Sequence, residues 1–292
     1  MTQLLKGKEV ADALTEKLQN RIKEMKQQGI EPCLAIVRAG ENPSDLSYER
    51  GALKRAEKVG VAVRRYVFDE AIAQEELIRE LEIINEDASI HGVLIFQPLP
   101  KQIDDAAVRS VLKPEKDVDG ITEGSLCGIF TASHRGFAPC TARACMEILG
   151  HYGINPTGKR VAVLGRSLVI GKPVAMMMME QNGTVTVCHS RTGEKNTKEI
   201  CKNSDIIIAA MGKAGMIGSE YISGSQIVID VGINVDEHGN LCGDVDFESV
   251  APLCGAITPV PGGVGAVTTA VLMLQVVEAA QTASNAAPWD RG

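Results

Sequence analysis

The chain has 292 residues, of which 45% are hydrophobic and 23% are charged, and its formal net charge is −7. This length allows two domains with hydrophobic cores of their own, and the composition is that of a soluble globular protein. A net negative chain without a basic stripe cannot neutralise a phosphate backbone, so we expect no nucleic-acid partner.

The chain also lacks the patterns of a membrane, disulfide-bonded or metal-binding protein. The first residues, MTQLLKGKEVADAL, contain no long apolar run, and no apolar segment is long enough to span a bilayer. The eight cysteines are an even number but form no CxxC pair, so buried, reduced thiols are expected rather than disulfides. We therefore expect a cytoplasmic protein with no membrane segment and no metal.

Predicted helices and strands alternate along the first half of the chain. Apolar residues at helical spacing predict helices over 9–28, 47–60 and 74–87. Runs typical of strands are PCLAIVRAG, VAVRRYVF and HGVLIFQPLP. This order predicts βαβ units with a parallel sheet, whose ligands bind at the carboxyl ends of the strands.

The same alternation returns after a helix predicted over 139–153. Strands are predicted at RVAVLG, TVTVCHS, DIIIAAMG and QIVIDVGIN, with a helix at GKPVAMMMMEQNG and a last one at 264–283. The predicted fold is α/β with two doubly wound domains. The first covers residues 1–140 and is completed by helix 264–283, the second is a Rossmann domain over 141–263, and the tail SNAAPWDRG is expected to fray.

The segment VAVLGRSLVIGKP reads as a strand, a glycine turn and the start of a helix. Gly165 and Gly171 would let the backbone approach a pyrophosphate at the helix N-terminus, although an ordinary βα turn has the same pattern. Arg166 lies in this turn, and Ser190 and Arg191 follow the next strand, where an arginine rather than an acid favours a 2′-phosphate. Solvated arginines are the alternative, but together the two favour NADP over NAD.

Two other loops could face a ligand. KPEKDVDG contains Asp117 and Asp119, and VPGGVGAVTT precedes the last helix. Turn aspartates commonly cap backbone groups, and a glycine loop can be a packing turn, so neither loop specifies a function alone. The five histidines show neither ligand spacing nor a nucleophile nearby.

Taken in order, QPLP, KDVDG, PCT, GRSxxxGKP, VIDVGIN, GDVDF and TPVPGGVG, with Tyr48 before them, resemble the methylenetetrahydrofolate dehydrogenase/cyclohydrolase family over nearly the whole chain. The resemblance implies a folate-binding N-terminal domain, an NAD(P)-binding Rossmann domain, a cleft between them and a homodimer. It assigns tetrahydrofolate derivatives to Tyr48, Asp119, Pro261, Gly262 and Gly263, with Tyr48 and Asp119 as the catalytic residues. It assigns the nucleotide to Gly165, Arg166, Ser167, Gly171, Ser190, Arg191 and Ile233.

The chain departs from the family pattern at two positions. The lysine credited with the cyclohydrolase step would stand four residues after Tyr48, where this chain has Ala52, and Phe96 replaces the family glutamine that touches that lysine. Lys54 is no substitute, because two residues along a helix turn a side chain through about 200°. Arg55 lies nearer that face but cannot release a proton to act as a base.

These departures predict different fates for the two family reactions. Hydride transfer from 5,10-methylenetetrahydrofolate needs mainly positioning, whereas hydrolysis of the methenyl product needs proton transfer, worth about 10²–10⁴-fold. We therefore expect an NAD(P)-dependent dehydrogenase with weak or absent cyclohydrolase activity. The alternatives are a fully bifunctional enzyme, a non-catalytic folate- or nucleotide-binding homologue, and a dehydrogenase for another small substrate.

Overall fold

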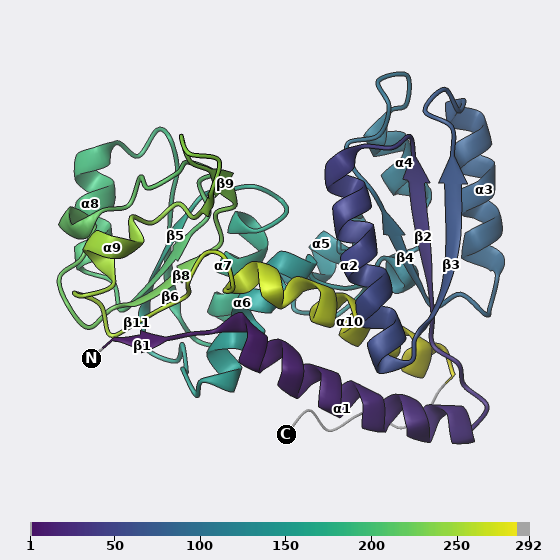
Figure 1. The fold of residues 1–292 in the computed structure, drawn as a ribbon, viewed down its shortest axis with the longest axis horizontal. Helices are drawn as coiled ribbons and strands as arrows, with labels where there is room; N and C mark the ends of the chain where they lie inside the picture. The colour runs from purple at the N-terminus through teal and green to yellow at the C-terminus, as the bar shows by residue number, and fades with distance from the viewer. Residues whose placement is uncertain (1, 285–292) are drawn as a thin grey trace. The chain divides into compact units, whose positions relative to one another are not determined.

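The computed structural model describes residues 2–284 (Figure 1). These residues form two compact units, each made from two separate stretches of the chain. One unit contains residues 13–140 and 269–284, and the other contains residues 2–12 and 141–268. Each unit has its own parallel sheet.

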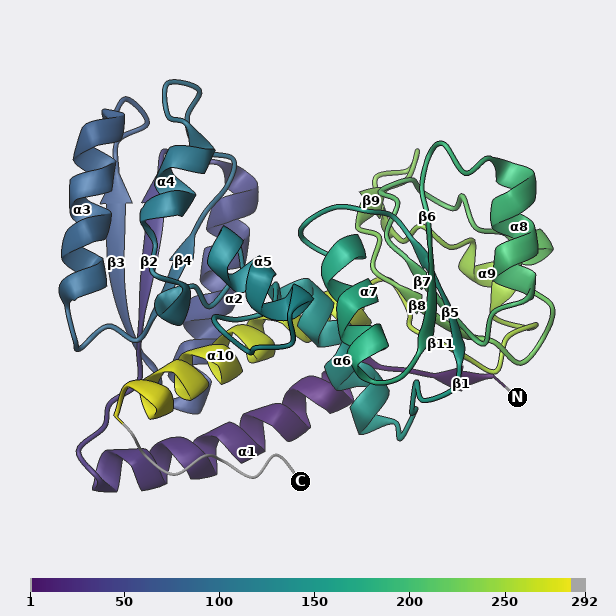
Figure 2. The same ribbon diagram turned by 180° about the vertical axis from the view of Figure 1, so that it is seen from behind.

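The unit of residues 13–140 is built on a three-stranded sheet in the order β3-β2-β4. Its central strand β2 (Cys33–Ala39) pairs in parallel with β3 (Ala62–Phe68) and β4 (Gly92–Ile95). Helices cover both faces, with α2 and α10 on one and α3 and α4 on the other, as the two opposite views show (Figures 1 and 2). The helices are α1 (Gly7–Gln27), α2 (Pro43–Val59), α3 (Gln74–Glu86), α4 (Asp105–Val111), α5 (Glu123–Phe130) and α10 (Thr268–Ala283), of which the first turns of α1 and the first residue of α10 group with the other unit.

Helix α2 is bounded by two local signals in the sequence. The side chain of Asn42 accepts the Ser44 N–H at 3.0 Å, and Pro43 occupies the first turn, where its missing N–H costs nothing. Gly60 ends the helix in the left-handed conformation at φ 90°. The buried face of α2 consists of Asp45, Glu49, Ala52, Ala56 and Val59.

The second unit is a six-stranded sheet in the order β1-β11-β8-β7-β5-β6, and all its pairs are parallel. Helices α6 and α7 lie on one side of this sheet and α8 and α9 on the other (Figures 1 and 2). The strands are β1 (Gln3–Leu4), β5 (Arg160–Leu164), β6 (Thr184–Cys188), β7 (Ile206–Ala209), β8 (Ile227–Asp230) and β11 (Ala256–Ile257). The helices are α6 (Cys140–His151), α7 (Gly171–Glu180), α8 (Glu194–Lys202) and α9 (Phe247–Val250), and β9 (Asn234–Val235) pairs with β10 (Leu241–Cys242).

The α/β class, the parallel sheets and the long helices are confirmed, but the predicted domain boundary needs correction. Residues 2–12 group with the C-terminal half because β1 pairs with β11, placing Gln3 opposite Ala256. The last helix begins at Thr268 rather than near 264, since Val264–Ala266 is a 3₁₀ turn. Most of the tail predicted to fray, from residue 285 onward, lies outside the described residues.

Within residues 2–284, no helix has the length and apolarity that crossing a bilayer requires. The same residues contain no cluster of three or more potential metal-ligating His, Cys, Asp or Glu side chains. All eight cysteines are free thiols; six are buried, whereas Cys127 is exposed and Cys242 is half-buried. The expectation of buried thiols is therefore wrong for those two.

Candidate active site

The predicted folate-site tyrosine and the two altered positions come together at one end of the three-stranded sheet. Tyr48 on α2 meets Phe96, which directly follows β4, in an edge-to-face contact with ring centroids 6.0 Å apart. Ala52 lies one turn after Tyr48 and is 0% exposed, and Phe96 is also buried. This part of the site therefore consists of two aromatic rings and a buried methyl group, with neither a lysine nor a glutamine at the two altered positions.

Neighbouring polar residues do not restore the missing pair. Lys54 is exposed, and the Arg55 guanidinium donates to the Thr15 hydroxyl at 2.7 Å. Gln97 is half-buried, and its Nε2 has no hydrogen-bond partner among the residues described. Gln97 precedes a cis peptide bond to Pro98. It lies two residues after Ile95, the last residue of β4 that pairs with β2.

Asp119, the predicted pterin anchor, is a carboxylate with a strongly perturbed pKa. Desolvation raises its pKa to about 7, helped by the negative charge of Asp117, while hydrogen bonds from the thiol and backbone N–H of Cys140 act in the opposite direction. Asp117 itself is fully buried and accepts the N–H groups of Ile121 and Thr122 at 3.0 and 2.8 Å. Asp117 therefore has a structural function, whereas Asp119 is a half-buried residue whose carboxylate is desolvated and bonded to Cys140.

In the other unit, the turn between β5 and α7 has the close backbone packing of a nucleotide-binding loop. A Cβ on Gly165, where φ is +133°, would lie 2.2 Å from the carbonyl oxygen of Ala210, and one on Gly171 would lie 2.3 Å from the oxygen of Gly165. Only glycine fits at either position. Arg166 and Ser167 are exposed on this turn, and the Ser167 hydroxyl accepts the N–H of Ile170 at 3.3 Å.

The remaining predicted residues of this unit lie on loops after the parallel strands. Ser190 and Arg191 are exposed beyond β6, and the Arg191 N–H donates to His189 Nδ1 at 3.2 Å. Ile233, which follows β8, is 70% exposed. A Cβ built on Gly265, two residues after the predicted loop of Pro261, Gly262 and Gly263, would lie 3.7 Å from Ile233 Cδ1.

These residues fit a dinucleotide, as judged from the loop itself. The two glycines let this loop pack tightly against the backbone of Ala210 and against itself, at the N-terminal end of a ten-residue helix whose free N–H groups favour an anion. Leu168 and Val169 expose apolar side chains on this turn, which a bound base or ring would cover. Arg166 and Arg191 offer positive charge for phosphate.

Two buried carboxylates that fix this region were not recognised from the sequence. Asp230 ends β8 and accepts the N–H groups of Gly232, Asp244 and Val245 at 2.9–3.0 Å. Asp244 is 0% exposed and accepts the N–H groups of Met211, Gly212 and Lys213 at 2.5–3.0 Å. Burial raises the pKa of Asp230 to about 6, with its three backbone hydrogen bonds opposing the shift.

The sequence did carry a signal for these acids, because each stands near a glycine in the VIDVGIN or GDVDF motif. In the structure, each acid faces the glycine of the other motif. A Cβ on Gly243 would lie 1.8 Å from Asp230 Oδ2, and one on Gly232 would lie 2.4 Å from the Asp244 backbone nitrogen. The VIDVGIN and GDVDF motifs therefore bring two loops together at a distance that only glycine permits.

We expect Asp244→Ala to lower the free energy of unfolding by about 2–4 kcal/mol, because it leaves several N–H donors without their charged acceptor. Urea titration followed by circular dichroism measures the loss. Asp236→Ala is the matched control, since that half-buried aspartate also accepts loop N–H groups, from His238 and Asn240. Equal losses in the two variants would contradict a special role for the buried carboxylate.

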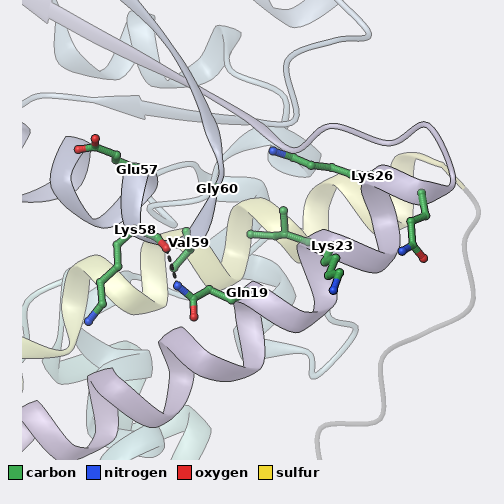
Figure 3. A pocket seen from close by; sticks show the side chains of 9 residues that line it. Gln19, Lys23, Lys26, Glu57, Lys58, Val59 and Gly60 are labelled. Carbon is green, nitrogen blue, oxygen red and sulfur yellow. Dashed lines mark hydrogen bonds between the residues drawn. The ribbon is translucent and has the colours of Figure 1, made fainter.

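A separate groove lies between the C-terminal parts of α1 and α2 (Figure 3). Gln19 Nε2 donates to the Lys58 carbonyl at 2.7 Å across it, and the ammonium groups of Lys26 and Lys58 point apart. Lysines near helix C-termini compensate the negative end of the helix dipole. The groove brings no reactive group together, and we assign it no function.

The fold and the glycine turn define a two-unit α/β protein with a dinucleotide-binding module. Family models agree: residues 5–119 match the catalytic domain of tetrahydrofolate dehydrogenase/cyclohydrolase, and residues 139–284 match its NAD(P)-binding domain. The chain belongs to the tetrahydrofolate dehydrogenase/cyclohydrolase family.

Individual relatives cover almost the whole chain. The bifunctional protein FolD of Carboxydothermus hydrogenoformans is 47% identical over 283 residues, covering 96% of this chain and 98% of the relative. The FolD structure from Campylobacter jejuni has a TM-score of 0.93 at 35% identity, covering 97% and 99% of the two chains. The Trypanosoma brucei dehydrogenase-cyclohydrolase, solved with NADP and an inhibitor, has a TM-score of 0.91 at 33% identity, covering 98% and 99%.

Proposed function

We propose that the chain oxidises 5,10-methylenetetrahydrofolate to 5,10-methenyltetrahydrofolate, with NADP as the hydride acceptor. The single observation that carries this proposal is Asp119, a half-buried residue whose desolvated carboxylate is held beside Cys140. Together with the glycine turn at Gly165 and Gly171, it supplies what binding of a pterin and a dinucleotide requires. We further infer that the protein is cytoplasmic and forms a homodimer, and light scattering on the purified chain tests the dimer.

In the proposed mechanism, the residues of the chain bind, orient and exclude water. Ionised Asp119 accepts two parallel N–H bonds from the aminopyrimidine edge of the folate and so fixes its orientation. Tyr48 and Phe96 provide an apolar wall against which the ring system packs. Bound NADP supplies the hydride acceptor, and no proton transfer by the protein is needed for this step.

NADP rather than NAD is proposed on the basis of charge. Arg166 and Arg191 are both exposed. At the end of β6, where an acid would bind a free ribose 2′-hydroxyl, the chain has Ser190 and Arg191 instead. The Trypanosoma brucei relative was solved with NADP.

We expect Arg191→Ala to raise the KM for NADP about tenfold or more while leaving the KM for NAD within about twofold, because only NADP carries the phosphate.

Hydrolysis of the methenyl product is where the residues and the relatives disagree. The buried Ala52 and Phe96 remove the groups credited with proton transfer, which favours a dehydrogenase with weak or absent cyclohydrolase activity. The relatives at 47 and 48% identity are named bifunctional. Their names favour a second candidate function, in which the chain catalyses both the oxidation and the hydrolysis.

If both activities are present, the candidate proton acceptor is Asp45. It is 8% exposed and lies on the buried face of α2 that also carries Ala52, with Tyr48 one turn away. Burial raises its pKa, partly offset by the Ser44 hydroxyl and the charge of Arg38. Under the second candidate function, Asp45→Asn abolishes hydrolysis and spares hydride transfer.

The deciding experiment is one progress curve with methylenetetrahydrofolate and NADP, repeated with NAD, in which reduced cofactor and methenyl absorbance are followed together. Methenyl folate that accumulates in step with NADPH means a dehydrogenase without the second activity. NADPH without methenyl accumulation means that hydrolysis persists and that the prediction from Ala52 and Phe96 is wrong. Absence of turnover with either cofactor refutes the proposed oxidation.

A further inference from the structure

Two chain segments far apart in sequence meet at the Asp119 carboxylate. Residues 117–120 carry the acid, and residues 137–140 carry Cys140, whose thiol lies 3.3 Å from the Val118 carbonyl oxygen. The approach is close, because a Cβ on Gly120 would lie 2.4 Å from the Pro139 nitrogen and 2.6 Å from the Ala138 carbonyl carbon. The direction of the carboxylate therefore depends on how these two segments are held together.

Gln275 on α10 bonds to both segments at once. Its Nε2 donates to the Val118 carbonyl oxygen at 2.7 Å and to the Ala138 carbonyl oxygen at 3.0 Å, and lies 3.5 Å from Cys140 Sγ. These two acceptors use both hydrogens of the amide nitrogen. Val118 directly precedes Asp119, so one side chain restrains the backbone on both sides of the carboxylate site.

The other half of the same amide is left unsatisfied. Gln275 is 0% exposed, and its Oε1 has no hydrogen-bond partner among the residues that the structure describes. A buried acceptor without a donor is unfavourable, and methionine or leucine would fill the space without creating one. The position therefore needs the two N–H donors rather than the volume of the side chain.

We propose that Gln275 is a positioning residue for the folate site, which clamps the segments of Val118 and Ala138 so that the Asp119 carboxylate faces the substrate. This inference rests on the proposed function and extends it from the carboxylate to the residue that aims it. Gln275 touches neither substrate nor cofactor in this role. It acts through the backbone of Val118 and through Cys140.

The test is Gln275→Met, which keeps length and apolar volume and removes both donors and the unpaired oxygen. We expect the KM for methylenetetrahydrofolate to rise about tenfold or more, the KM for NADP to stay unchanged and kcat to fall less than the KM rises. A looser site also admits water to Asp119, so its pKa moves down from about 7 and the acidic limb of the kcat/KM profile shifts to lower pH.

Gln281→Met is the matched control, because Gln281 is a second buried glutamine on α10, six residues further along. Gln275→Leu repeats the test in case the methionine variant folds poorly. A Gln275 variant with the KM and pH profile of the wild type overturns the inference, as does a variant that merely reproduces the effects of Gln281→Met. Absence of turnover in the wild type instead overturns the proposed function, and this inference with it.

Discussion

Replacing Asp119 by alanine should lower kcat/KM for methylenetetrahydrofolate by about 10²–10⁴-fold, because two hydrogen bonds to a charged acceptor are worth about 1.5–3 kcal/mol each. The KM for NADP should remain within about twofold of the wild-type value, since that site lies on other loops. Steady-state kinetics with each substrate varied in turn measure both effects. Gly120 is unsuitable as a neighbouring control because a Cβ there meets the Pro139 backbone.

The suitable control is Asp117→Asn. Asp117 lies two residues away and is 0% exposed, and it accepts backbone N–H groups rather than facing a ligand. It should cost stability, since an amide nitrogen would face one of those N–H donors, but its effect on the folate KM should be smaller. An Asp119→Ala variant that retains wild-type kcat/KM, or a larger kinetic effect from Asp117→Asn, would contradict the assignment of Asp119.

The pH dependence of the wild type should report the same carboxylate. The pKa of Asp119 is raised to about 7, so the ionised form that accepts substrate N–H bonds is lost as the pH falls below this value. We expect kcat/KM for the folate to decrease about tenfold per pH unit below the pKa. In Asp119→Asn this acidic limb should disappear, although activity is low throughout.

Stability should change in the opposite direction over the same pH range. The folded-state pKa of Asp119 lies above the unfolded value of 3.8, so between these values the folded chain binds a proton that the unfolded chain does not. The contribution of Asp119 therefore favours folding at low pH and is lost as the pH rises through about 7. Urea titrations of the wild type and Asp119→Asn over this range should converge toward low pH.

Sequence patterns predicted the elements whose residues repeat with a clear period. The predicted ends of helix α3 and strand β2 lie within one residue of the ends in the structure, because their apolar residues follow helical or strand spacing. Helix α5 was missed because it contains Gly124 and Gly128, which argue against a helix. Both glycines have a packing reason: a Cβ on either would lie within 2.4 Å of Pro114 or Arg135.

Features that depend on partners distant in the chain could not be predicted. Strands β1 and β11 have two residues each and exist because they pair across about 250 residues of chain, which no local window contains. The acceptor function of Asp244 likewise depends on loops 31–33 residues away. By contrast, the resemblance to the dehydrogenase/cyclohydrolase family identifies Tyr48, Ala52 and Phe96 as site positions from the sequence alone. The contact between Tyr48 and Phe96 is seen only in the structure.

Glu49 should prove one of the most destabilising sites for substitution in the folate-binding unit. Its carboxylate accepts Arg38 Nε at 3.1 Å and Arg65 Nε at 2.6 Å, and both Glu49 and Arg38 side chains are 3% exposed. Glu49→Ala would leave the Arg38 guanidinium buried without its counter-charge. We expect a loss of about 3–5 kcal/mol in the free energy of unfolding, measured by urea titration with circular dichroism.

Two further variants separate the burial of the charge from the loss of an ion pair as such. Glu86→Ala breaks a pair with Lys113 at 2.7 Å whose side chains are 78% and 45% exposed, and should cost far less stability than Glu49→Ala, because solvent screens an exposed pair. The double variant Arg38→Met, Glu49→Leu removes both charges and should recover most of the stability, because the penalty of Glu49→Ala comes from one uncompensated charge rather than from a lost attraction. A double variant as unstable as Glu49→Ala would show instead that packing around α2, next to Tyr48, depends on the salt bridge itself.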